Sequence, residues 1–492
     1  MLMIEEQDVQ RRIRLENPWW ESPHTISEPY QRWKPRPYLD LFCPLIKETS
    51  VRRAIVLMGP RRVGKTVMIH HAIQTLINDG IPSKSICYLS VDNPIYNTLT
   101  PERFLASYAQ AAGVDLDKDQ LYVFFDEIQY MKNWETHLKV LVDTRANIKA
   151  VVSGSAAAAL KLKSDESGAG RFTDVLLPPL TFYEYLELLD EGDIVTKPDF
   201  HTNDIKLLNE KFLYYLNFGG YPEVIFSKQI QADPARFIKS DIIDKVLLRD
   251  LPSLYGISDI QELNYLFTTL AFNTANEVSL EELSKNSGVA KNTIKRYIEY
   301  LRAAFLIQVI HRVDRSSKRF RRANYFKVYL TNPSMRAALF SPVKEDEAIL
   351  PHLAETAIFS QWFHSDITLR YARWKDGEVD MVNLDRADQK PIWAIEVKWS
   401  DRYCEKPREL ESLIDYCIEN GLPSAIVTSK SMSVTCKVND VTLNFIPASI
   451  YCYMVGYNLI RHKTHPVKPV KEILRGEAKI LEPMEPNDED TA

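Results

Sequence analysis

The sequence lacks the features that mark several classes of protein. Its 492 residues include only six cysteines, with no C-x-x-C pair, which argues against a zinc ribbon or a disulfide framework and fits a reducing cytoplasm. No apolar run approaches the roughly 20 residues needed to span a bilayer, and the charged N-terminus lacks an apolar signal segment. We therefore expect a cytoplasmic protein that does not contact a membrane.

A strong excess of one charge is also missing. Lysine and arginine number 61 against 66 aspartates and glutamates, so the formal net charge is -5. This balance excludes a uniformly basic coat for nucleic acid but leaves local basic patches open. With 45% hydrophobic residues the chain is expected to be globular, and its length predicts about two to four domains.

The first 50 residues are rich in proline, which favours an extended leader that wraps a neighbouring domain. We interpret Trp19 and Trp20 as residues that pack against that domain. From residue 54 onward, continuous apolar runs alternate with helical stretches, a pattern typical of a parallel sheet covered on both faces. These runs, which predict an α/β nucleotide-binding core, are 54–58, 86–91, 121–125, 150–152 and 175–177.

The first of these runs is followed by the pattern G-x-x-x-x-G-K-[ST], and a helix is expected directly after it. In this context the loop amides and the positive helix end face phosphate groups. Lys65 is predicted to reach the β- and γ-phosphates of ATP, and the Thr66 hydroxyl to bind Mg²⁺. The predicted ATP-binding residues of the loop are Gly59, Pro60, Arg61, Arg62, Val63, Gly64, Lys65, Thr66 and Val67.

An Asp-Glu pair ends the third apolar run. Asp126 is predicted to hold the magnesium ion beside the phosphate loop, and Glu127 to polarise the attacking water. The alternative for Glu127 is a surface carboxylate without a catalytic role. Ser153 follows the fourth run and is predicted to sense the γ-phosphate, with a helix cap as its alternative role.

A helix-turn-helix spacing occupies the middle of the chain. Helices are expected at 261–272, 280–287 and 292–304, followed by a strand, a very basic loop and a second strand, which together resemble a winged helix. Cations on the third helix and in the basic loop are predicted to contact DNA. These cations are Lys291, Lys295, Arg296, Arg319, Arg321 and Arg322. The alternatives are a wing that packs on an acidic face and a protein-docking module.

A second constellation of charged residues follows. Asp380, Glu396 and Lys398 lie on predicted neighbouring strands in the spacing of the PD-(D/E)XK nuclease core, which they resemble. Asp380 and Glu396 are predicted to share a divalent metal ion, and Lys398 to handle the attacking water. Glu355, on the preceding helix, matches the additional acidic metal ligand of several such nucleases. The alternative is a domain that is retained only for folding or binding.

The combined motifs resemble the prokaryotic AAA-type ATPases on the archaeal-ATPase and STAND-like side of AAA+. The motifs are the phosphate loop, Asp126 to Gln129, Ser153 to Ser155, Gly170-Arg171 and Gly219 to Glu223. The resemblance implies a parallel sheet of order 5-1-4-3-2, with Arg171 as the arginine-finger candidate; an ordinary ion pair is the alternative for Arg171. The implied domains are a leader (1–50), a P-loop AAA+ core (51–180), a helical lid (181–255), a winged helix (256–345), a restriction-endonuclease-like α/β domain (346–460) and a disordered tail (461–492).

Two functions remain open at this stage. The first is an ATP- and Mg²⁺-dependent enzyme that processes or surveys DNA. The second is a nucleotide-controlled regulatory switch with an inactive nuclease-like domain and a protein partner. The sequence does not determine the oligomeric state, and a homo-oligomer is one of the possibilities.

Overall fold

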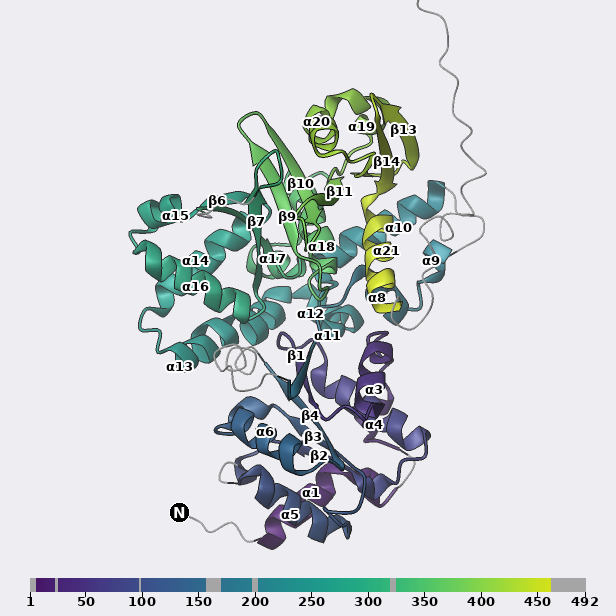
Figure 1. The fold of residues 1–492 in the computed structure, drawn as a ribbon, viewed down its shortest axis with the longest axis vertical. Coiled ribbons are helices and arrows are strands. Elements are labelled where there is room, and N and C mark those ends of the chain that lie inside the picture. Colours follow the sequence, from purple (N-terminus) through teal and green to yellow (C-terminus); the bar gives the residue numbers. More distant parts are fainter. Residues whose placement is uncertain are drawn as a thin grey trace, which may run out of the picture. The chain divides into compact units, whose positions relative to one another are not determined.

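A computed structural model describes residues 6–22, 25–96, 99–155, 170–196, 202–318 and 324–461 (Figure 1). The chain folds into two compact units, each assembled from three separate stretches of sequence. The N-terminal unit comprises Met1–Leu180, Gly220–Ala271 and Ser287–Gln308. The C-terminal unit comprises Thr181–Gly219, Phe272–Asn286 and Val309–Ala492.

A five-stranded sheet forms the centre of the N-terminal unit. Its strands are β1 (Ala54–Met58), β2 (Ile86–Ser90), β3 (Leu121–Asp126), β4 (Ile148–Gly154) and β5 (Phe172–Leu176). All neighbouring pairs run parallel, in the order β2-β3-β4-β1-β5. The order 5-1-4-3-2 predicted for the core is therefore confirmed.

Helices cover this sheet (Figure 1). They include α4 (Lys65–Asn78), α5 (Pro101–Ala112) and α6 (Trp134–Thr144), and short 3₁₀ turns lie at Pro18–Trp20, Ser83–Ser85, Pro94–Tyr96 and Ile128–Tyr130. Every residue of β3 is buried, because its apolar side chains meet covering elements on both faces. Phe125 and Trp134 belong to one hydrophobic core in this unit.

The leader is helical rather than extended, so that prediction was wrong. It contains α1 (Glu6–Glu16), α2 (Glu28–Gln31) and α3 (Leu39–Lys47). The prolines that suggested an extended chain are compatible with helix where they occupy the first turn, as in α2. The interpretation of Trp19 and Trp20 as packing residues is confirmed, because both indole N–H groups donate to the Ile86 carbonyl at the edge of the sheet.

The rest of the N-terminal unit is helical. Its elements are α11 (Pro222–Phe226), α12 (Lys228–Ala232), α13 (Leu251–Tyr255), α14 (Ile260–Phe272) and α16 (Lys291–Ala303). Between α12 and α13 the backbone adopts two wide π-helical stretches, Ala235–Asp244 and Val246–Asp250. Such π-helical geometry is rare and is frequent at functional sites.

A nine-stranded mixed sheet organises the C-terminal unit, in the order β13-β14-β12-β11-β10-β9-β7-β8-β6. Its strands are β6 (Glu277–Ser279), β7 (Ile307–Val313), β8 (Tyr325–Leu330), β9 (Leu369–Trp374), β10 (Gly377–Leu384), β11 (Pro391–Glu396), β12 (Ser424–Ser429), β13 (Val434–Val438) and β14 (Val441–Pro447). Strands β9, β10 and β11 form antiparallel neighbours, whereas β11 pairs with β12 in parallel.

Helices complete this unit. They are α8 (Phe182–Leu188), α9 (Asp193–Thr196), α10 (Thr202–Phe218), α15 (Leu280–Ser287), α17 (Ser334–Leu339), α18 (Leu350–Gln361), α19 (Arg402–Glu405), α20 (Glu411–Asn420) and α21 (Ala448–Arg461), with a 3₁₀ turn at Pro407–Glu409. Thr181 and Glu184 form a capping box that fixes the start of α8. Helix α21 packs on α8 and α18.

The two units do not follow the predicted domain limits. The predicted lid, 181–255, is divided at residue 219, because its first part folds with the C-terminal unit. The predicted limit at residue 345 falls inside one continuous sheet, since β7 pairs in parallel with β9. Apart from its first residue, the predicted tail 461–492 lies outside the described residues.

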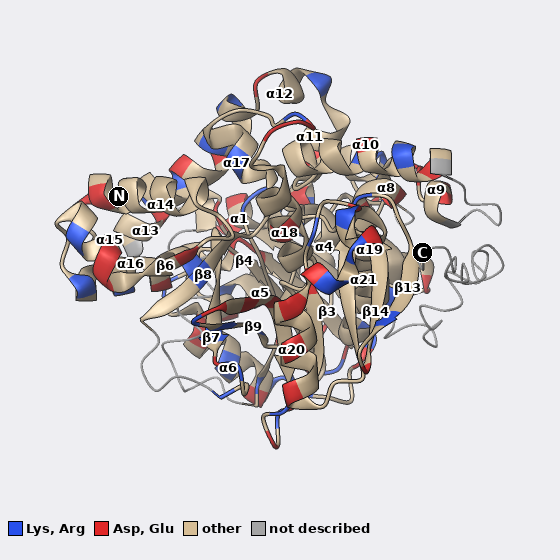
Figure 2. Cartoon of the chain, turned by 90° about the horizontal axis from the view of Figure 1, so that it is seen from above, with Lys and Arg blue, Asp and Glu red and all other residues tan. Residues whose placement is uncertain are grey.

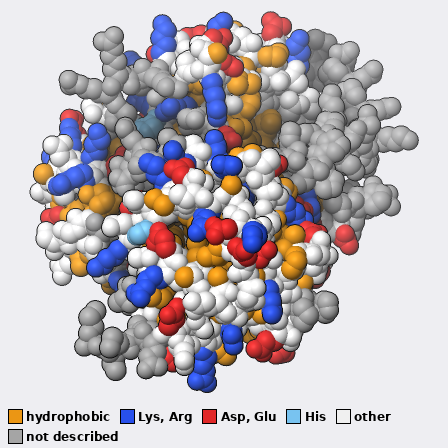
Figure 3. Space-filling model, turned by 60° about the horizontal axis from the view of Figure 1, so that its bottom comes forward, with side chains coloured by type: hydrophobic (Ala, Val, Ile, Leu, Met, Phe, Trp, Pro, Cys, Tyr) orange, Lys and Arg blue, Asp and Glu red, His pale blue; other side chains and the backbone are white. Residues whose placement is uncertain are grey.

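Within the described residues, no helix is both long enough and apolar enough to cross a membrane. Acidic and basic residues are both scattered among the elements of the chain (Figure 2). They are also interspersed on the face that Figure 3 shows, in keeping with the small net charge.

Candidate nucleotide site

The phosphate loop joins β1 to α4. Two glycines shape it. A Cβ atom at Gly59 would lie 2.2 Å from the Leu177 carbonyl oxygen, so only glycine fits there. Gly64 has a φ of +93°, a left-handed conformation that favours glycine, and it caps the start of α4.

Lys65 is the first residue of α4, and its ammonium group is buried. It donates to the carbonyl oxygens of Gly59 at 3.0 Å and Pro60 at 2.8 Å. Burial lowers the pKa of Lys65. Within the described residues no carboxylate lies within ion-pair distance of this ammonium, so the loop holds a buried positive charge that suits an anionic ligand.

An arginine outside the phosphate loop also holds the loop in place. The buried Arg36, from the stretch before α3, donates to the Val63 carbonyl at 2.8 Å and to the Pro178 carbonyl at 3.0 Å. It therefore ties the phosphate loop to the segment that follows β5. Sequence reasoning missed Arg36 because nothing in its proline-rich surroundings marks it as part of a distant site.

Asp126 ends β3 beside the loop, as predicted, and is only 1% exposed. Its Oδ2 accepts hydrogen bonds from the Thr66 hydroxyl at 2.6 Å and from the Tyr88 hydroxyl at 2.9 Å. Its Oδ1 accepts a hydrogen bond from the Ser153 hydroxyl. A buried carboxylate surrounded by hydroxyl groups, next to an anion-binding loop, is a set of hard oxygen donors that fits Mg²⁺. Tyr88 was not predicted.

Glu127 follows in a left-handed conformation, with a φ of 56°. Its backbone N–H donates to the Ser153 hydroxyl at 3.2 Å, and its side chain accepts a hydrogen bond from the Gln129 amide. Ser153 therefore links the Asp126 side chain to the Glu127 backbone. Because non-glycine residues adopt this conformation rarely, the strained backbone at Glu127 is consistent with a functional position.

The two loop arginines bind acidic residues of the helical part of the same unit. Arg61 makes two hydrogen bonds to the Asp250 carboxylate, at 2.8 and 2.9 Å. Arg62 donates to Glu223 at 2.9 Å and to Asp241 at 3.0 Å. Asp241 and Asp250 lie in the π-helical stretches, so these stretches are joined directly to the phosphate loop.

Arg171, the arginine-finger candidate, forms an ion pair with Asp143 at 2.8 Å. Both side chains of the pair are partly exposed. Arg171 lies just before β5, at the end of the sheet opposite to the phosphate loop. The alternative role, an ordinary ion pair, is therefore present in this structure. The finger role stays a prediction.

The carboxylate–lysine constellation lies in the C-terminal unit. Asp380 on β10 and Glu396 on β11 are both buried, and Lys398 Nζ contacts Glu396 Oε1 at 2.7 Å. The Asp380 carboxylate also accepts a hydrogen bond from the Val397 amide at 2.9 Å. Glu396 Oε2 is buried without a hydrogen-bond partner, which makes it the unsatisfied oxygen of this cluster.

An unpredicted lysine lies between these carboxylates. Lys327 on β8 is buried, with a side chain only 5% exposed. Its ammonium lies 3.1 Å from Glu355, 2.6 Å from Glu378 and 3.3 Å from Asp380. No local pattern in the sequence predicts this position of Lys327, because only the packing of distant elements brings β8 near Glu355 and Asp380. Within the described parts of the chain no group of three metal-ligating side chains is arranged to hold an ion.

The electrostatics of this cluster follow from burial. Burial and the charge of Asp380 raise the pKa of Glu396 to about 8. Burial also raises the pKa of Glu355 to about 7, against the effect of Lys327. Burial alone would raise the pKa of Asp380, but the neighbouring lysines hold it below its usual value.

The predicted DNA-contacting residues fall into two groups. Lys291, Lys295 and Arg296 are exposed on α16, while that helix buries residues such as Ile294 and Leu301. The other three, Arg319, Arg321 and Arg322, lie outside the described residues.

Neighbouring cations of the basic stretch are engaged within the unit itself. Arg312 lies 3.7 Å from Glu277, and Arg315 pairs with Asp415 and Glu419. For these residues the alternative of a wing that packs on acidic groups holds.

Comparison with known families agrees with the N-terminal unit. Residues 51–186 match the model of an AAA domain, and residues 209–346 match a domain of unknown function (DUF8612). The chain therefore carries an AAA domain, and its five-stranded parallel sheet has the corresponding order.

Similar proteins have been described without an assigned function. An uncharacterized protein of Methanocaldococcus jannaschii is 25% identical over 338 residues, which cover 66% of this chain and 71% of that protein. An uncharacterized protein of Haemophilus influenzae is 22% identical over 380 residues, which cover 76% of this chain and 88% of that protein.

Two solved structures show a distant likeness. The ORC1 protein of Aeropyrum pernix in complex with DNA has 13% identity and a TM-score of 0.28, and the match covers 61% of this chain and 91% of that one. The S. cerevisiae Hsp104:casein complex has 15% identity and a TM-score of 0.31, covering 60% of this chain and 55% of that one. At these scores the likeness carries no argument about function.

Proposed function

We propose that this protein is an ATP-hydrolysing enzyme of the AAA type that acts on DNA. One observation supports the proposed ATPase activity. The phosphate loop, the Asp-Glu pair and Ser153 meet at the carboxyl ends of neighbouring parallel strands. Thr66 of the phosphate loop contacts Asp126, and Ser153 links Asp126 to Glu127. The buried Lys65 and the buried Asp126 both adjoin Thr66, Lys65 as its neighbour in the chain and Asp126 through a hydrogen bond, which suits a phosphate and its magnesium ion.

The chain's own residues take distinct parts in this proposal. ATP with Mg²⁺, when bound, supplies the reactive phosphoanhydride. Lys65 would hold the β- and γ-phosphates, and Thr66 with Asp126 would hold the metal ion. Glu127 would orient and polarise the attacking water, while Ser153 keeps Asp126 and Glu127 in register.

The experiment is ATP turnover by the purified full chain in magnesium, with and without DNA. Lys65→Ala serves as the variant that should not bind ATP, because it removes the cation that is proposed to reach the phosphates. We expect turnover by the wild type, none above background by Lys65→Ala, and a change in rate on adding DNA. An unchanged rate with every DNA form would remove the DNA part of the proposal and leave the ATPase part standing.

The DNA part rests on the order of elements and on charge. The order α14, β6, α15, α16, β7, β8 is the order expected for a winged helix, which supports the proposal, and α16 exposes Lys291, Lys295 and Arg296. Neutralising Arg319, Arg321 and Arg322 together should weaken DNA binding similarly for all sequences and reduce the salt dependence by up to about 3 units of slope. Unchanged affinity and slope would favour a protein-docking role.

A metal-dependent nuclease is the second candidate function, and one oxygen atom favours it. Glu396 Oε2 is buried and unpartnered, beside Asp380 and Lys398, and a carboxylate oxygen is a ligand that hard divalent metal ions accept. Lys327 favours the opposite reading, a regulatory switch with an inactive nuclease-like domain and a protein partner, because its ammonium already neutralises the carboxylates.

Cleavage of linear, nicked and branched DNA by wild type and Lys398→Ala, in manganese and with or without ATP, separates these two readings. A nuclease predicts activity in the wild type that Asp380→Ala, Glu396→Ala and Lys398→Ala each reduce to a similar floor. Identical traces for wild type and Lys398→Ala would leave the switch reading. Both readings use the same ATPase site.

A further inference from the structure

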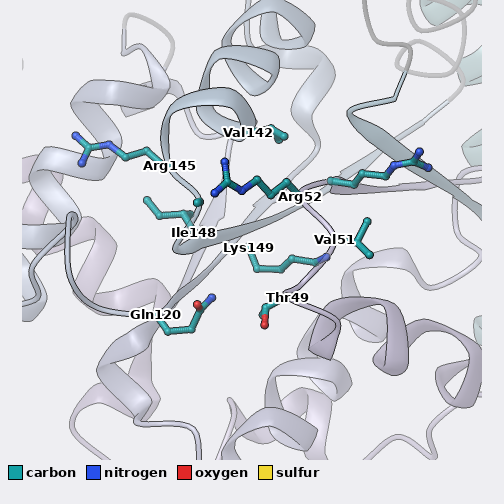
Figure 4. A pocket seen from close by; sticks show the side chains of 10 residues that line it. Thr49, Val51, Arg52, Gln120, Val142, Arg145, Ile148 and Lys149 are labelled. Atoms are coloured by element: carbon teal, nitrogen blue, oxygen red, sulfur yellow. The ribbon is translucent and has the colours of Figure 1, made fainter.

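A hollow lined by cations lies on the N-terminal unit, at the amino ends of the parallel strands. The candidate nucleotide site lies at the carboxyl ends of the same strands. Its volume is about 290 Å³, and ten residues line it. They come from the approach to β1, the end of α6, the residue before β3 and the start of β4 (Figure 4). The lining residues are Thr49, Val51, Arg52, Arg53, Gln120, Val142, Arg145, Ala146, Ile148 and Lys149.

The charged residues that line this hollow are all positive. Four of the lining residues are cations and none is acidic. Arg145 has a carboxylate partner, Asp117. In the described structure no carboxylate pairs with Arg52 or Arg53, although both side chains are exposed beside the hollow. A concave surface that gathers uncompensated positive charge attracts anions.

Lys149 adds a buried charge. It is only 5% exposed, and its ammonium donates to the Glu48 carbonyl at 2.6 Å rather than to a carboxylate. Burial lowers its pKa, and the nearby Glu48 carboxylate acts in the opposite direction, so part of the Lys149 charge is balanced. The Arg52 guanidinium extends toward Ile148 and the Lys149 ammonium toward Val51 (Figure 4). Gln120 and Thr49 add neutral hydrogen-bonding groups.

The hollow is separate from the nucleotide site. β1 spans five residues between them, so at about 3.3 Å per residue the two sites lie roughly 15 Å apart along the strand. The volume of the hollow includes space that is open to solvent, so the hollow is a shallow surface site rather than an enclosed cavity.

We infer that this hollow binds phosphate groups, with Arg52 and Arg53 as the principal contacts. Arginine forks match phosphate oxygens in two-point hydrogen bonds, which selects phosphate over a carboxylate of the same charge. The phosphate belongs either to a nucleic-acid backbone or to a small phosphorylated ligand. This site goes beyond the proposed function, because its residues belong neither to the phosphate loop nor to α16.

The test measures binding of inorganic phosphate and of a short single-stranded DNA of about 12 nucleotides to the full chain. Saturating MgADP in every sample keeps the contribution of the phosphate loop constant. The test variant is Arg52→Gln/Arg53→Gln, whose side chains are exposed, so its folding should be unaffected. The charge-matched control is Lys390→Gln/Lys437→Gln, which removes two exposed cations of the C-terminal unit.

We expect at least about tenfold weaker phosphate binding by Arg52→Gln/Arg53→Gln, since each hydrogen bond to a charged group contributes roughly that factor. Arg52→Lys/Arg53→Lys should keep part of the affinity. Weaker binding of both phosphate and DNA identifies a nucleic-acid backbone, and weaker binding of phosphate alone identifies a small ligand. Equal affinities in wild type and the glutamine variant, or an equal loss in the control, would overturn the assignment.

Discussion

The Thr66 hydroxyl donates a 2.6 Å hydrogen bond to Oδ2 of Asp126. These residues are sixty positions apart, and their contact joins the phosphate loop to the end of β3. The same two side chains would hold the magnesium ion in the proposed ATPase.

This contact predicts a metal-specific defect. Thr66→Ala removes a metal ligand without touching Lys65, so it should weaken ATP binding about tenfold or more in magnesium and little in EDTA. Thr66→Ser keeps the hydroxyl and should bind nearly as wild type. Titration with a fluorescent ATP analogue measures both conditions. Equal defects of Thr66→Ala with and without magnesium would place the hydroxyl outside the metal site.

The bond between Arg61 and Asp250 is predicted to stabilise the N-terminal unit. Their side chains are 23% and 10% exposed, so the pair is largely protected from solvent. A double-mutant cycle with Arg61→Ala and Asp250→Ala should give a coupling free energy of about 1 to 3 kcal/mol in urea unfolding.

The ion pair of Arg171 and Asp143 serves as the control for this cycle. Its side chains are 37% and 44% exposed, and exposed pairs contribute less than about 1 kcal/mol. If the free-energy changes of Arg61→Ala and Asp250→Ala simply add, this pair does not stabilise the contact between the π-helical stretches and the phosphate loop.

Local signals explain what the sequence predicted correctly. The run that forms β1, the spacing from Gly59 to Thr66 and the acidic end of β3 are contiguous in the chain, so periodicity and motif spacing suffice to find them. Thr66 and Asp126, which are predicted to hold Mg²⁺, could be picked out for the same reason, and the structure brings them into contact. The sheet order came from the family resemblance and was confirmed.

Long-range pairing explains what the sequence missed. Tyr88, Arg36 and Lys327 reach their sites only because distant elements pack together, and no local pattern reports that. The strand β6 has only three residues, too few to show a clear alternation. The leader helices were missed because proline density was weighted above the acidic first turn and apolar spacing of α1.

Lys327 is predicted to block metal binding in the C-terminal unit. Lys327→Met leaves Glu355, Glu378 and Asp380 without their shared cation, so their mutual repulsion should lower stability in metal-free buffer. Manganese should then raise the melting temperature of Lys327→Met by several degrees and that of wild type hardly at all. The double variant Lys327→Met/Asp380→Asn should lose most of this response. Equal manganese responses in wild type and Lys327→Met would show that the lysine does not compete with a metal.

His70 predicts a pH dependence of stability. Its ring is buried in α4, stacked on Tyr30 at 3.8 Å, and close to Tyr88 and Trp19. Burial, with a smaller effect of His71, lowers the pKa of His70 to about 3. The folded state therefore favours neutral histidine, and the stability that this gives above pH 6.5 is lost as the pH falls toward 3.

The size of this effect follows from a single proton. Between pH 7 and pH 5 wild type should lose about 2 kcal/mol more unfolding free energy than His70→Phe, which keeps an aromatic ring but cannot be protonated. Urea unfolding at the two pH values measures the difference. Parallel losses in both proteins would mean that His70 is protonated in the folded state.

The most direct test of the central claim is steady-state ATP turnover in magnesium by wild type and Glu127→Gln, with ATP binding measured on the same samples. Glutamine keeps the shape of the side chain but cannot act as a base. If Glu127 positions and polarises the water beside Asp126, Glu127→Gln should bind ATP with wild-type affinity and turn it over at least about 100-fold more slowly. Wild-type turnover by Glu127→Gln would contradict this account of the site.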